Sequence, residues 1–276
     1  MLLVGSRRHA MKRGRSDSLR GIKALTFDTG GTVLDWHEGF VTALAAAGEK
    51  HGVKDKDWDA LANKLRVSSM AKVVSQGKDA DTFKELQSLK TFDEGHREAL
   101  EELLPEMGLT GLSDAEKRAI WFDAPHSFRA WSDFPAVLPK LRENFMVCSF
   151  TLLSYRLIMD TAKANGLSWD AVFSCEGIGK YKIQPEAYLS VAKYLQLDPS
   201  EICMVATHNF DLNAARACGY KSAFVKRKDE WGPTGHPETD IMSKSGDKHV
   251  ATPDEHHDVI CDTFPELAAR LGVALA

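Results

Sequence analysis

The residues best suited to chemistry in this chain begin at Asp28, at the end of a short, mostly apolar run, residues 22–27. Beyond Asp28 the chain continues with Thr29, Gly30 and Gly31. A short apolar run that ends in glycines is typical of a buried strand followed by a tight turn. In open α/β sheets, ligands bind beyond the carboxyl ends of the strands, where glycines let backbone N–H groups approach an anion. Asp28 is therefore placed to act as a nucleophile or a metal ligand, or more simply to cap the next helix.

Polar residues also follow three later apolar segments. They are Thr151 after 145–150, Lys180 and Lys182 after 171–174, and Thr207, His208, Asn209 and Asp211 after 202–206. The carboxyl ends of parallel strands meet at one edge of a sheet, so we expect these side chains to converge on Asp28. We expect Lys182 to face inward and Lys180 to face outward, because alternate residues of an extended chain point to opposite faces. A carboxylate nucleophile, a hydroxyl, a lysine and a second carboxylate would then share one site.

The elements that must position this site follow a regular order after residue 145. We expect strands at 145–150, 171–174, 202–206, 222–225 and 259–261, and helices at 154–165, 185–195, 212–218 and 264–271. Such alternation indicates an α/β fold, a Rossmann-like parallel sheet with helices on both faces.

Residues 37–132 have a different character, with helical spacing of apolar residues and almost no strand-like alternation. Ser113 and Glu116 form a capping-box pattern that should begin a helix with Ile120 and Trp121 on its buried side. The sequence thus predicts a core of residues 21–36 and 133–276. An all-helical cap, residues 37–132, would be inserted after the first strand and lie over the carboxyl edge of the sheet.

Composition narrows the classes of partner. A net charge of −4 and a pI near 6.2 favour neither nucleic acid nor an anionic membrane, and no apolar stretch approaches the ~20 residues that span a bilayer. The five cysteines are dispersed without a Cys-x-x-Cys pair, which favours reduced thiols in a cytoplasmic protein over disulfides or a zinc site. Residues 1–20 carry six basic side chains against one acidic one and are expected to form a disordered tail. A small-molecule substrate remains the natural partner.

These motifs together resemble those of the haloacid dehalogenase superfamily, and most closely its type II 2-haloacid dehalogenases. The resemblance runs from residue 21 to residue 233 and weakens within the cap. It rests on Asp-x-x-Gly-Thr at 28–32, on the hydroxyl of Thr151, on the lysine-bearing segment 181–188 and on the segment 205–211 that ends in Asp211. Segments 33–36, 166–170, 214–219 and 224–233 add to it.

The resemblance implies metal-independent hydrolysis of a short 2-haloacid, without a cofactor. Asp28 would displace halide from C2, and water would hydrolyse the resulting aspartyl ester. Lys182 would keep Asp28 ionised, and Asp211 would orient Lys182 and the water. The catalytic residues implied are Asp28, Lys182, Asp211, Thr32 and Thr151, and the substrate contacts implied are Thr29, Gly30, Arg66, Leu152, Tyr188, His208 and Asn209. Family members are often dimers, so a homodimer is possible.

Two departures separate the chain from the phosphatases of the superfamily. Gly30 stands where they keep a second aspartate as an acid, and Thr207 stands where they keep an extra carboxylate for Mg²⁺. An alkoxide leaving group needs an acid and Mg²⁺ prefers carboxylate ligands, whereas a halide leaves as a stable anion. Both departures favour a dehalogenase over the alternative of a Mg²⁺-dependent phosphatase.

Two further departures concern the halide site itself. Leu152 replaces an asparagine that contacts the halide in the family, and the cap arginine has two candidates, Arg66 and Lys64. These differences leave open a non-catalytic member that has lost its halide site. Against that alternative, a buried lysine between two carboxylates is costly to keep without a use.

Overall fold

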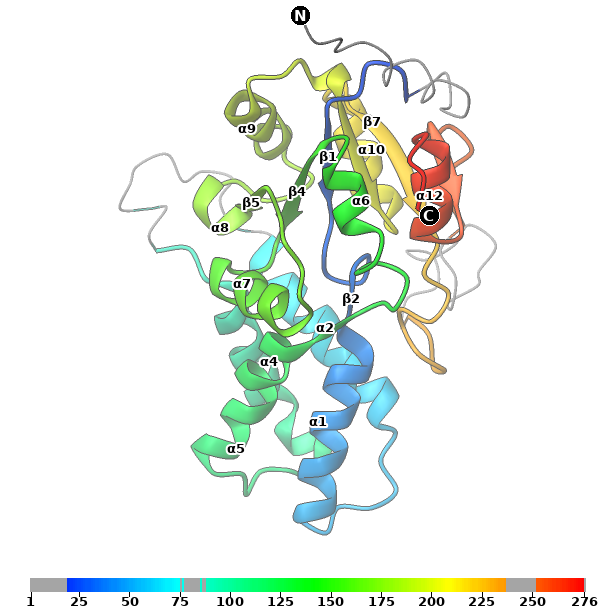
Figure 1. Ribbon diagram of the computed structural model, residues 1–276. Helices are drawn as coiled ribbons and strands as arrows, with labels where there is room; N and C mark the ends of the chain where they lie inside the picture. The colour runs from blue at the N-terminus through cyan, green and yellow to red at the C-terminus, as the bar shows by residue number, and fades with distance from the viewer. Residues whose placement is uncertain (1–18, 75, 77–84, 86–87, 237–251, 276) are drawn as a thin grey trace, which may run out of the picture.

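The computed structural model describes residues 19–74, 76, 85, 88–236 and 252–275 (Figure 1). Residues 1–18 of the predicted tail lie outside this range, but Leu19 is fully buried in the core, so the core begins before residue 21. Within the described ranges, no helix combines the length and apolarity that crossing a membrane requires.

A six-stranded parallel sheet forms the centre of the molecule, as predicted. Its strands, in spatial order, are β5 (Ala171–Ser174), β4 (Met146–Thr151), β1 (Ala24–Phe27), β6 (Ile202–Ala206), β7 (Lys221–Val225) and β8 (Val259–Cys261). All neighbouring pairs are parallel, and β1 pairs with β4 on one side and β6 on the other. Every residue of β1 is buried, which is expected for a central strand covered on both faces.

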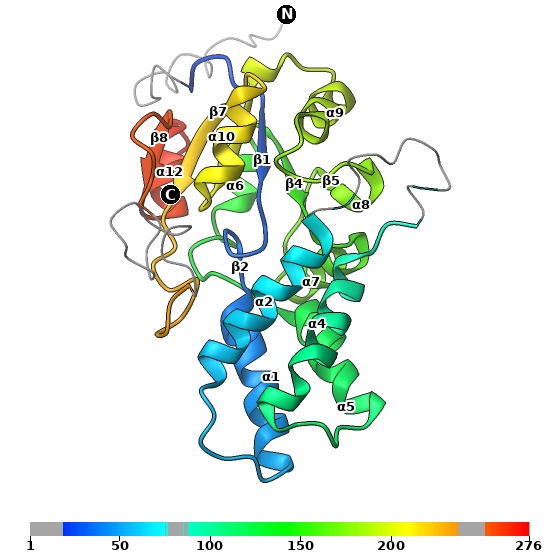
Figure 2. The ribbon, with the colours of Figure 1, turned by 180° about the vertical axis from the view of Figure 1, so that it is seen from behind.

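Helices cover both faces of this sheet. They are α6 (Leu138–Arg142), α7 (Tyr155–Ala164), α9 (Pro185–Leu195), α10 (Asn209–Ala217) and α12 (Phe264–Arg270). Figures 1 and 2 show α6 and α12 on one face and α10 on the other. Helix α10 begins three residues before the predicted start, because its apolar periodicity starts only at Leu212 while the helix turns directly out of β6. Asp211 consequently lies in its first turn.

The segment between β1 and β4 is largely helical. It contains α1 (Trp36–Lys50), α2 (Trp58–Val74), α4 (Phe92–Met107) and α5 (Asp114–Arg118), here called the cap helices, followed by a π-helical turn, η3 (Ala119–Asp123), and a short turn, η4 (Pro125–Ser127). Figure 1 shows the cap helices grouped at the end of the sheet where β1 leads into β2. The capping box at Ser113 and Glu116 is confirmed; Ile120 is buried and Trp121 half-buried.

A small ribbon joins the sheet to the cap helices, and it departs from the prediction of an all-helical insertion. Strand β2 (Leu34–Asp35) pairs antiparallel with β3 (Arg129–Ala130), so the segment 37–132 also contains a strand. Two-residue strands are too short to show the alternation that identifies a strand in sequence.

Aromatic packing fixes the end of β1 that carries Asp28. The ring of Phe27 lies 5.4 Å from that of Phe134 and 5.8 Å from that of Phe264, centroid to centroid. Phe27 is fully buried, and such burial stabilises by roughly 1.5–3 kcal/mol. The backbone of Asp28 is further held by its N–H, which donates to Val205 O at 2.9 Å.

Candidate active site

Three donors converge on the buried carboxylate of Asp28. Lys182 Nζ donates to Oδ1 at 2.6 Å, Thr32 Oγ1 donates to Oδ2 at 2.7 Å, and His208 Nδ1 lies 3.3 Å from Oδ2. Asp28 is 7% exposed and Lys182 is 2% exposed, so these contacts are formed in a medium where charges interact strongly. The structure thus brings Asp28, Thr32 and Lys182 together.

The cations decide the ionisation of Asp28. Burial alone would raise its pKa, but the charge of Lys182 and the contact with His208 outweigh burial and hold the pKa of Asp28 well below its ordinary value. Burial would likewise lower the pKa of Lys182, but Asp211 and Asp28 raise it above its ordinary value. Asp28 is therefore an ionised carboxylate with little water around it, which suits a nucleophile.

Asp211 is the second carboxylate bound to Lys182. Its Oδ2 accepts from Lys182 Nζ at 2.6 Å and its Oδ1 accepts from the Tyr188 hydroxyl at 2.6 Å. Burial and the nearby negative charge of Asp28 raise the pKa of Asp211, although Lys182 opposes them. The Tyr188 hydroxyl also accepts from Ile183 N at 3.3 Å. Tyr188 therefore contacts Asp211 from behind and does not line the cavity described below, so the structure does not place it against a substrate.

Lys182 reaches this position by a route that the sequence did not indicate. A short helix, α8 (Cys175–Ile178), and the left-handed Gly179 separate it from β5, so alternation along a strand does not determine which way it points. Ile183 directly after it has φ of 68°, a conformation that a β-branched residue rarely adopts. The following proline begins α9, whose Tyr188 accepts from Ile183 N and fixes this turn.

Two threonines adjoin Asp28: Thr29 follows it in the chain, and Thr151 lines the same recess. Thr29 Oγ1 donates to Thr151 Oγ1 at 2.6 Å, and Thr151 Oγ1 also accepts from Leu153 N at 3.1 Å. Both acceptor positions of the Thr151 hydroxyl are then used, and its own proton is left to point toward a ligand. Thr29 is fully buried and supports Thr151.

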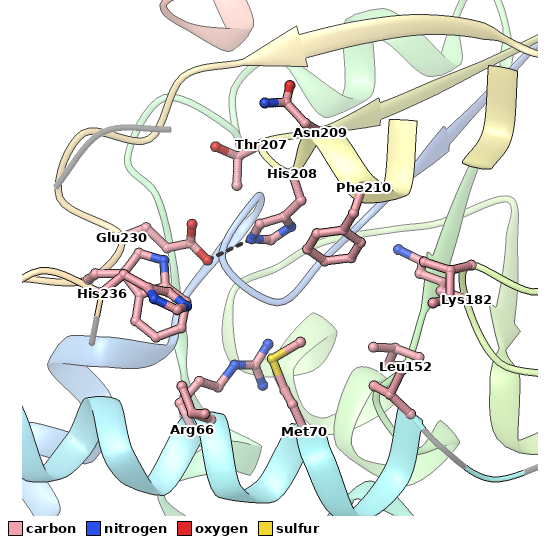
Figure 3. A pocket seen from close by; sticks show the side chains of 14 residues that line it. Arg66, Met70, Leu152, Lys182, Thr207, His208, Asn209, Phe210, Glu230 and His236 are labelled. Atoms are coloured by element: carbon pink, nitrogen blue, oxygen red, sulfur yellow. Dashed lines mark hydrogen bonds and ion pairs between the residues drawn. The ribbon is translucent and has the colours of Figure 1, made fainter. Parts of the chain in front are cut away.

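A cavity of about 300 Å³ opens beside these groups (Figure 3). Its apolar lining consists of Val67, Met70, Val74, Leu152, Ile183, Phe210 and Trp231, and its polar lining of Arg66, Lys182, Thr207, His208, Asn209, Glu230 and His236. A narrower recess continues from it to Asp28, Gly30, Thr151 and Asp211. Leu152 lines both spaces, so at this position the ligand would meet an apolar surface.

Arg66 supplies the cation of the cap helices. Its side chain projects from α2 between the rings of Trp36 and Phe92, with Cζ 5.4 Å and 5.1 Å from their centroids. It is 5% exposed, and its Nη1 makes no hydrogen bond to the described part of the protein. A Cβ at Gly30 would lie 2.7 Å from Arg66 Nη2, so the glycine leaves room for the guanidinium. The other candidate, Lys64, pairs with Glu106 on the surface.

Glu230 is a site residue that sequence reasoning missed. It is 2% exposed, and its Oε1 lies 2.9 Å from His208 Nε2 and accepts from Trp36 Nε1 at 3.3 Å. Burial would lower the pKa of His208, but Glu230 and Asp28 raise it to about 10, so His208 is an imidazolium at neutral pH. Extending the search for polar residues to the loop after β7 would have found Glu230.

The side-chain amide of Asn209 points away from the cavity. Its Nδ2 donates to Thr252 O at 2.7 Å and its Oδ1 accepts from Asp254 N at 3.1 Å. In Figure 3 the amide points away from Lys182 and Arg66. Asn209 lines the cavity, while its amide holds residues 252–254.

Few groups here could hold a metal. A metal site beside Asp28 would need further carboxylates at two positions, but the chain has Gly30 and Thr207 there. The carboxylates of Asp28 and Asp211 are both bonded to Lys182. Elsewhere in the described chain, Asp254, His256 and His257 have ligand atoms within 4.8 Å of one another. The ring nitrogens of His257 already lie 3.3 Å from Ser222 Oγ and 3.0 Å from Asn209 Oδ1, so this group is satisfied by hydrogen bonds.

Comparisons with known proteins identify the family of the chain. A family model described as haloacid dehalogenase-like hydrolase matches residues 22–219. The chain is 25% identical over 209 residues to (S)-2-haloacid dehalogenase 1 of Pseudomonas sp. (strain CBS-3), covering 75% of this chain and 85% of that protein.

Two solved structures superpose closely. The defluorinating L-2-haloacid dehalogenase Rha0230 has a TM-score of 0.76 and 32% identity over 93% of this chain and 98% of that one. The L-2-haloacid dehalogenase PA0810 has a TM-score of 0.75 and 28% identity over 91% and 98%. The chain belongs to the haloacid dehalogenase-like hydrolase family.

Proposed function

We propose that this protein hydrolyses the carbon–halogen bond of a short 2-halocarboxylate, through an ester on Asp28 and without a metal. One observation carries the proposal: the ionised Asp28 adjoins a largely apolar cavity that also contains the open N–H of Arg66. An apolar cavity suits a carbon–halogen group, and a guanidinium suits an anion. The relatives are named as dehalogenases of L- or (S)-2-haloacids, which supports this substrate class and that enantiomer.

The first step is displacement at carbon. An oxygen of Asp28 attacks C2 of the substrate, the C2–halogen bond breaks, and halide leaves with the bonding electrons. Arg66 and the Thr151 hydroxyl are the donors that bind the anionic groups, the substrate carboxylate and the departing halide. Lys182 keeps Asp28 ionised and in place. Residues 37–132 act in this proposal as a cap on the core, residues 21–36 and 133–276, and the cap provides Arg66.

The second step is hydrolysis of the ester. Water attacks Cγ of Asp28 and gives a proton to Asp211, whose raised pKa suits a base in this position. The Cγ–O–C2 bridge then breaks at Cγ, the 2-hydroxyacid oxygen takes up a proton, and the Asp28 carboxylate is restored. The net products are the 2-hydroxyacid, halide and one proton.

Gly30 and Thr207 support metal independence. A phosphate ester would need an acid near Gly30 and a carboxylate ligand near Thr207, and a halide needs neither. No observation favours the phosphatase. The cluster of Asp28, Lys182 and Asp211 also argues against a non-catalytic protein, because a buried ion network of this kind destabilises unless it is complete.

Halide release is the direct test. Purified protein is incubated with chloroacetate, fluoroacetate and each enantiomer of 2-chloropropionate, with EDTA present and Asp28→Asn as the control. We expect halide release from at least the L enantiomer, unaffected by EDTA and lost in Asp28→Asn. A protein that releases no halide but hydrolyses phosphate esters when Mg²⁺ is added would contradict the proposal.

A further inference from the structure

We propose that His208 acts in the second half of this reaction as the donor to the ester carbonyl oxygen, and that Glu230 is the positioning residue that holds His208 in place. The inference rests on the proposed function and deepens it. It assigns different tasks to the two oxygens of Asp28, and it gives a role to Glu230, a residue to which the sequence alone assigned none.

The hydrogen bonds distinguish the two oxygens of Asp28. Each carboxylate oxygen has two lone-pair positions. Oδ2 faces Thr32 Oγ1 at 2.7 Å and His208 Nδ1 at 3.3 Å, while among the described residues Oδ1 accepts only from Lys182. Oδ1 is therefore the oxygen with a free lone pair, and we assign it as the nucleophile. Oδ2 then becomes the carbonyl oxygen of the ester and keeps Thr32 and His208 as its donors.

The charge on His208 is fixed by its two neighbours. Nδ1 faces Asp28 and Nε2 faces Glu230, so both ring nitrogens must donate when both carboxylates are ionised. Lys182 is bonded to Asp28, and the charge of Arg66 acts on both carboxylates. Asp211 also acts on Asp28, and Asp35 and Arg227 act on Glu230. Once Asp28 is esterified, its negative charge is gone, and Glu230 is the carboxylate that remains on the imidazolium.

Glu230 is itself held tightly. Trp36 Nε1 donates to its Oε1, and a Cβ on Gly31 would lie 2.0 Å from the same oxygen. Gly31 has φ of 91°, so glycine is required there by both conformation and space. Phe210 stacks on the His208 ring at 5.3 Å with an interplanar angle of 21°, and Figure 3 shows the ring between Phe210 and Glu230. The imidazolium therefore has one orientation, aimed at Asp28.

The chemistry of the step follows from this placement. When water attacks Cγ, the π electrons of the ester carbonyl move to Oδ2, where an N–H of His208 and the hydroxyl of Thr32 receive the developing charge. When the tetrahedral intermediate collapses, these electrons re-form the C=O bond and the Cγ–Oδ1 bond breaks, so Oδ1 leaves on the 2-hydroxyacid. His208 keeps its proton throughout. Removing one such donor typically costs about 10²–10³ in rate.

The experiment separates the two steps with Glu230→Gln, which keeps the size and a hydrogen-bonding oxygen but removes the charge. Enzyme and L-2-chloropropionate are mixed rapidly, chloride is followed in time, and the intact protein is weighed by mass spectrometry. Lys182 still ionises Asp28, so we expect a burst of about one chloride per site, followed by turnover slowed about 10²-fold. The protein should accumulate with the 1-carboxyethyl group on Asp28. Glu143→Gln, a surface change, should behave as the wild type.

Each outcome of this experiment either supports or overturns the proposed roles of His208 and Glu230. A slowed Glu230→Gln without a burst or adduct, or one with unchanged turnover, would overturn the role in hydrolysis. If Glu230→Gln does not fold, His208→Gln is measured in the same way and must show the burst and the adduct. Because a structural defect would slow both steps alike, the accumulation of ester is the readout that it cannot imitate. Failure of the proposed function is distinct, since the wild type would then release no chloride at all.

Discussion

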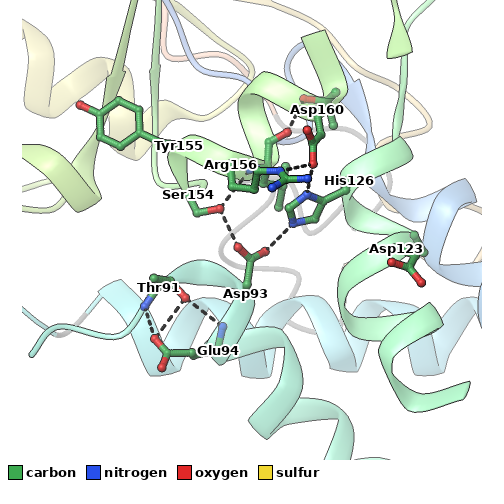
Figure 4. A network of polar contacts seen from close by, with 12 residues as sticks. Thr91, Asp93, Glu94, Asp123, His126, Ser154, Tyr155, Arg156 and Asp160 are labelled. Carbon is green, nitrogen blue, oxygen red and sulfur yellow. Dashed lines mark hydrogen bonds and ion pairs between the residues drawn. The ribbon is translucent and has the colours of Figure 1, made fainter. Parts of the chain in front are cut away.

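His126 Nδ1 lies 2.9 Å from Oδ2 of Asp160, and this contact connects η4 to helix α7 beside the sheet (Figure 4). On its other side, His126 Nε2 lies 3.1 Å from Asp93 Oδ1 on α4, and Asp93 Oδ2 accepts from Ser154 Oγ at 2.6 Å. Burial would lower the pKa of His126, but Asp93 and Asp160 outweigh burial and raise it. The pKa values of Asp93 and Asp160 are lowered by their contacts with His126. The junction between cap helices and sheet is therefore ionic.

We predict that His126→Gln makes stability less dependent on pH. Because the pKa of His126 is raised in the folded state, its charge stabilises the fold fully below the ordinary pKa of 6.5. This stabilisation is lost as the pH rises through the raised, folded-state pKa. The carboxylates stabilise above their ordinary pKa of 3.8 and lose the effect as pH falls. The variant should thus be less stable than the wild type by about 1 kcal/mol near pH 5–6 and closest to it at alkaline pH. Urea unfolding across this range measures the difference; a constant difference would contradict the prediction.

Lys182→Met is predicted to damage stability as well as activity. It leaves the buried Asp211 without its cation and Asp28 with His208 alone, which costs about 3–5 kcal/mol. Burial then raises the pKa of Asp211 above that of the unfolded chain, so this group should destabilise the variant increasingly as pH rises. Thermal unfolding at several pH values, with Lys180→Met as the control, tests this. Unchanged stability at neutral pH would mean that the ion network is not formed.

Arg66→Gln is predicted to weaken substrate capture. Loss of a charged hydrogen bond costs about 1.5–3 kcal/mol, roughly ten- to a hundredfold in kcat/KM. Lys64→Gln lies on the same helix and breaks only a surface pair, so it should leave kcat/KM unchanged. Steady-state halide release measures both. If Lys64→Gln were the more damaging change, the assignment of the cap cation would be wrong.

Gly31→Ala is predicted to be more harmful than Gly21→Ala, although both glycines have similar positive φ, 91° and 87°. A side chain at Gly21 meets nothing within 4 Å, whereas one at Gly31 collides with Glu230. Both variants should lose about 1 kcal/mol of stability from backbone strain, and only Gly31→Ala should also lose most of its activity. Chemical unfolding and halide release, measured side by side, separate the two effects.

Much of the sheet could be predicted from sequence because its signals are local. The strands 171–174, 202–206 and 259–261 and the helix 185–195 match the structure residue for residue. Each is a short apolar run or a run with helical periodicity, and these patterns can be recognised from residues that are close in sequence. The ribbon of β2 and β3 was missed because pairing between residues 34–35 and 129–130 leaves no local trace.

The site was predictable where side chains stand at the ends of strands. Asp28, Thr151 and Asp211 follow that rule, and Lys182 joins them in spite of the intervening helix α8. Glu230 was missed because the search for polar residues did not extend to the loop after β7, and its partner His208 lies 22 residues earlier. Arg66 comes from a separate helix, and only the packing of Trp36 and Phe92 around it shows which cation of α2 points inward.

The position of β1 between β4 and β6 also determines when the protein can become active during synthesis. Asp28 is made early, but Lys182 follows it by 154 residues, and the strands on both sides of β1 also come later than the cap helices. Contacts within the cap helices are local and form quickly, whereas the parallel pairs of β1 must wait for distant partners. A nascent chain therefore carries Asp28 without the lysine that ionises and holds it, and their ion pair can form only after the last of the central strands has been made.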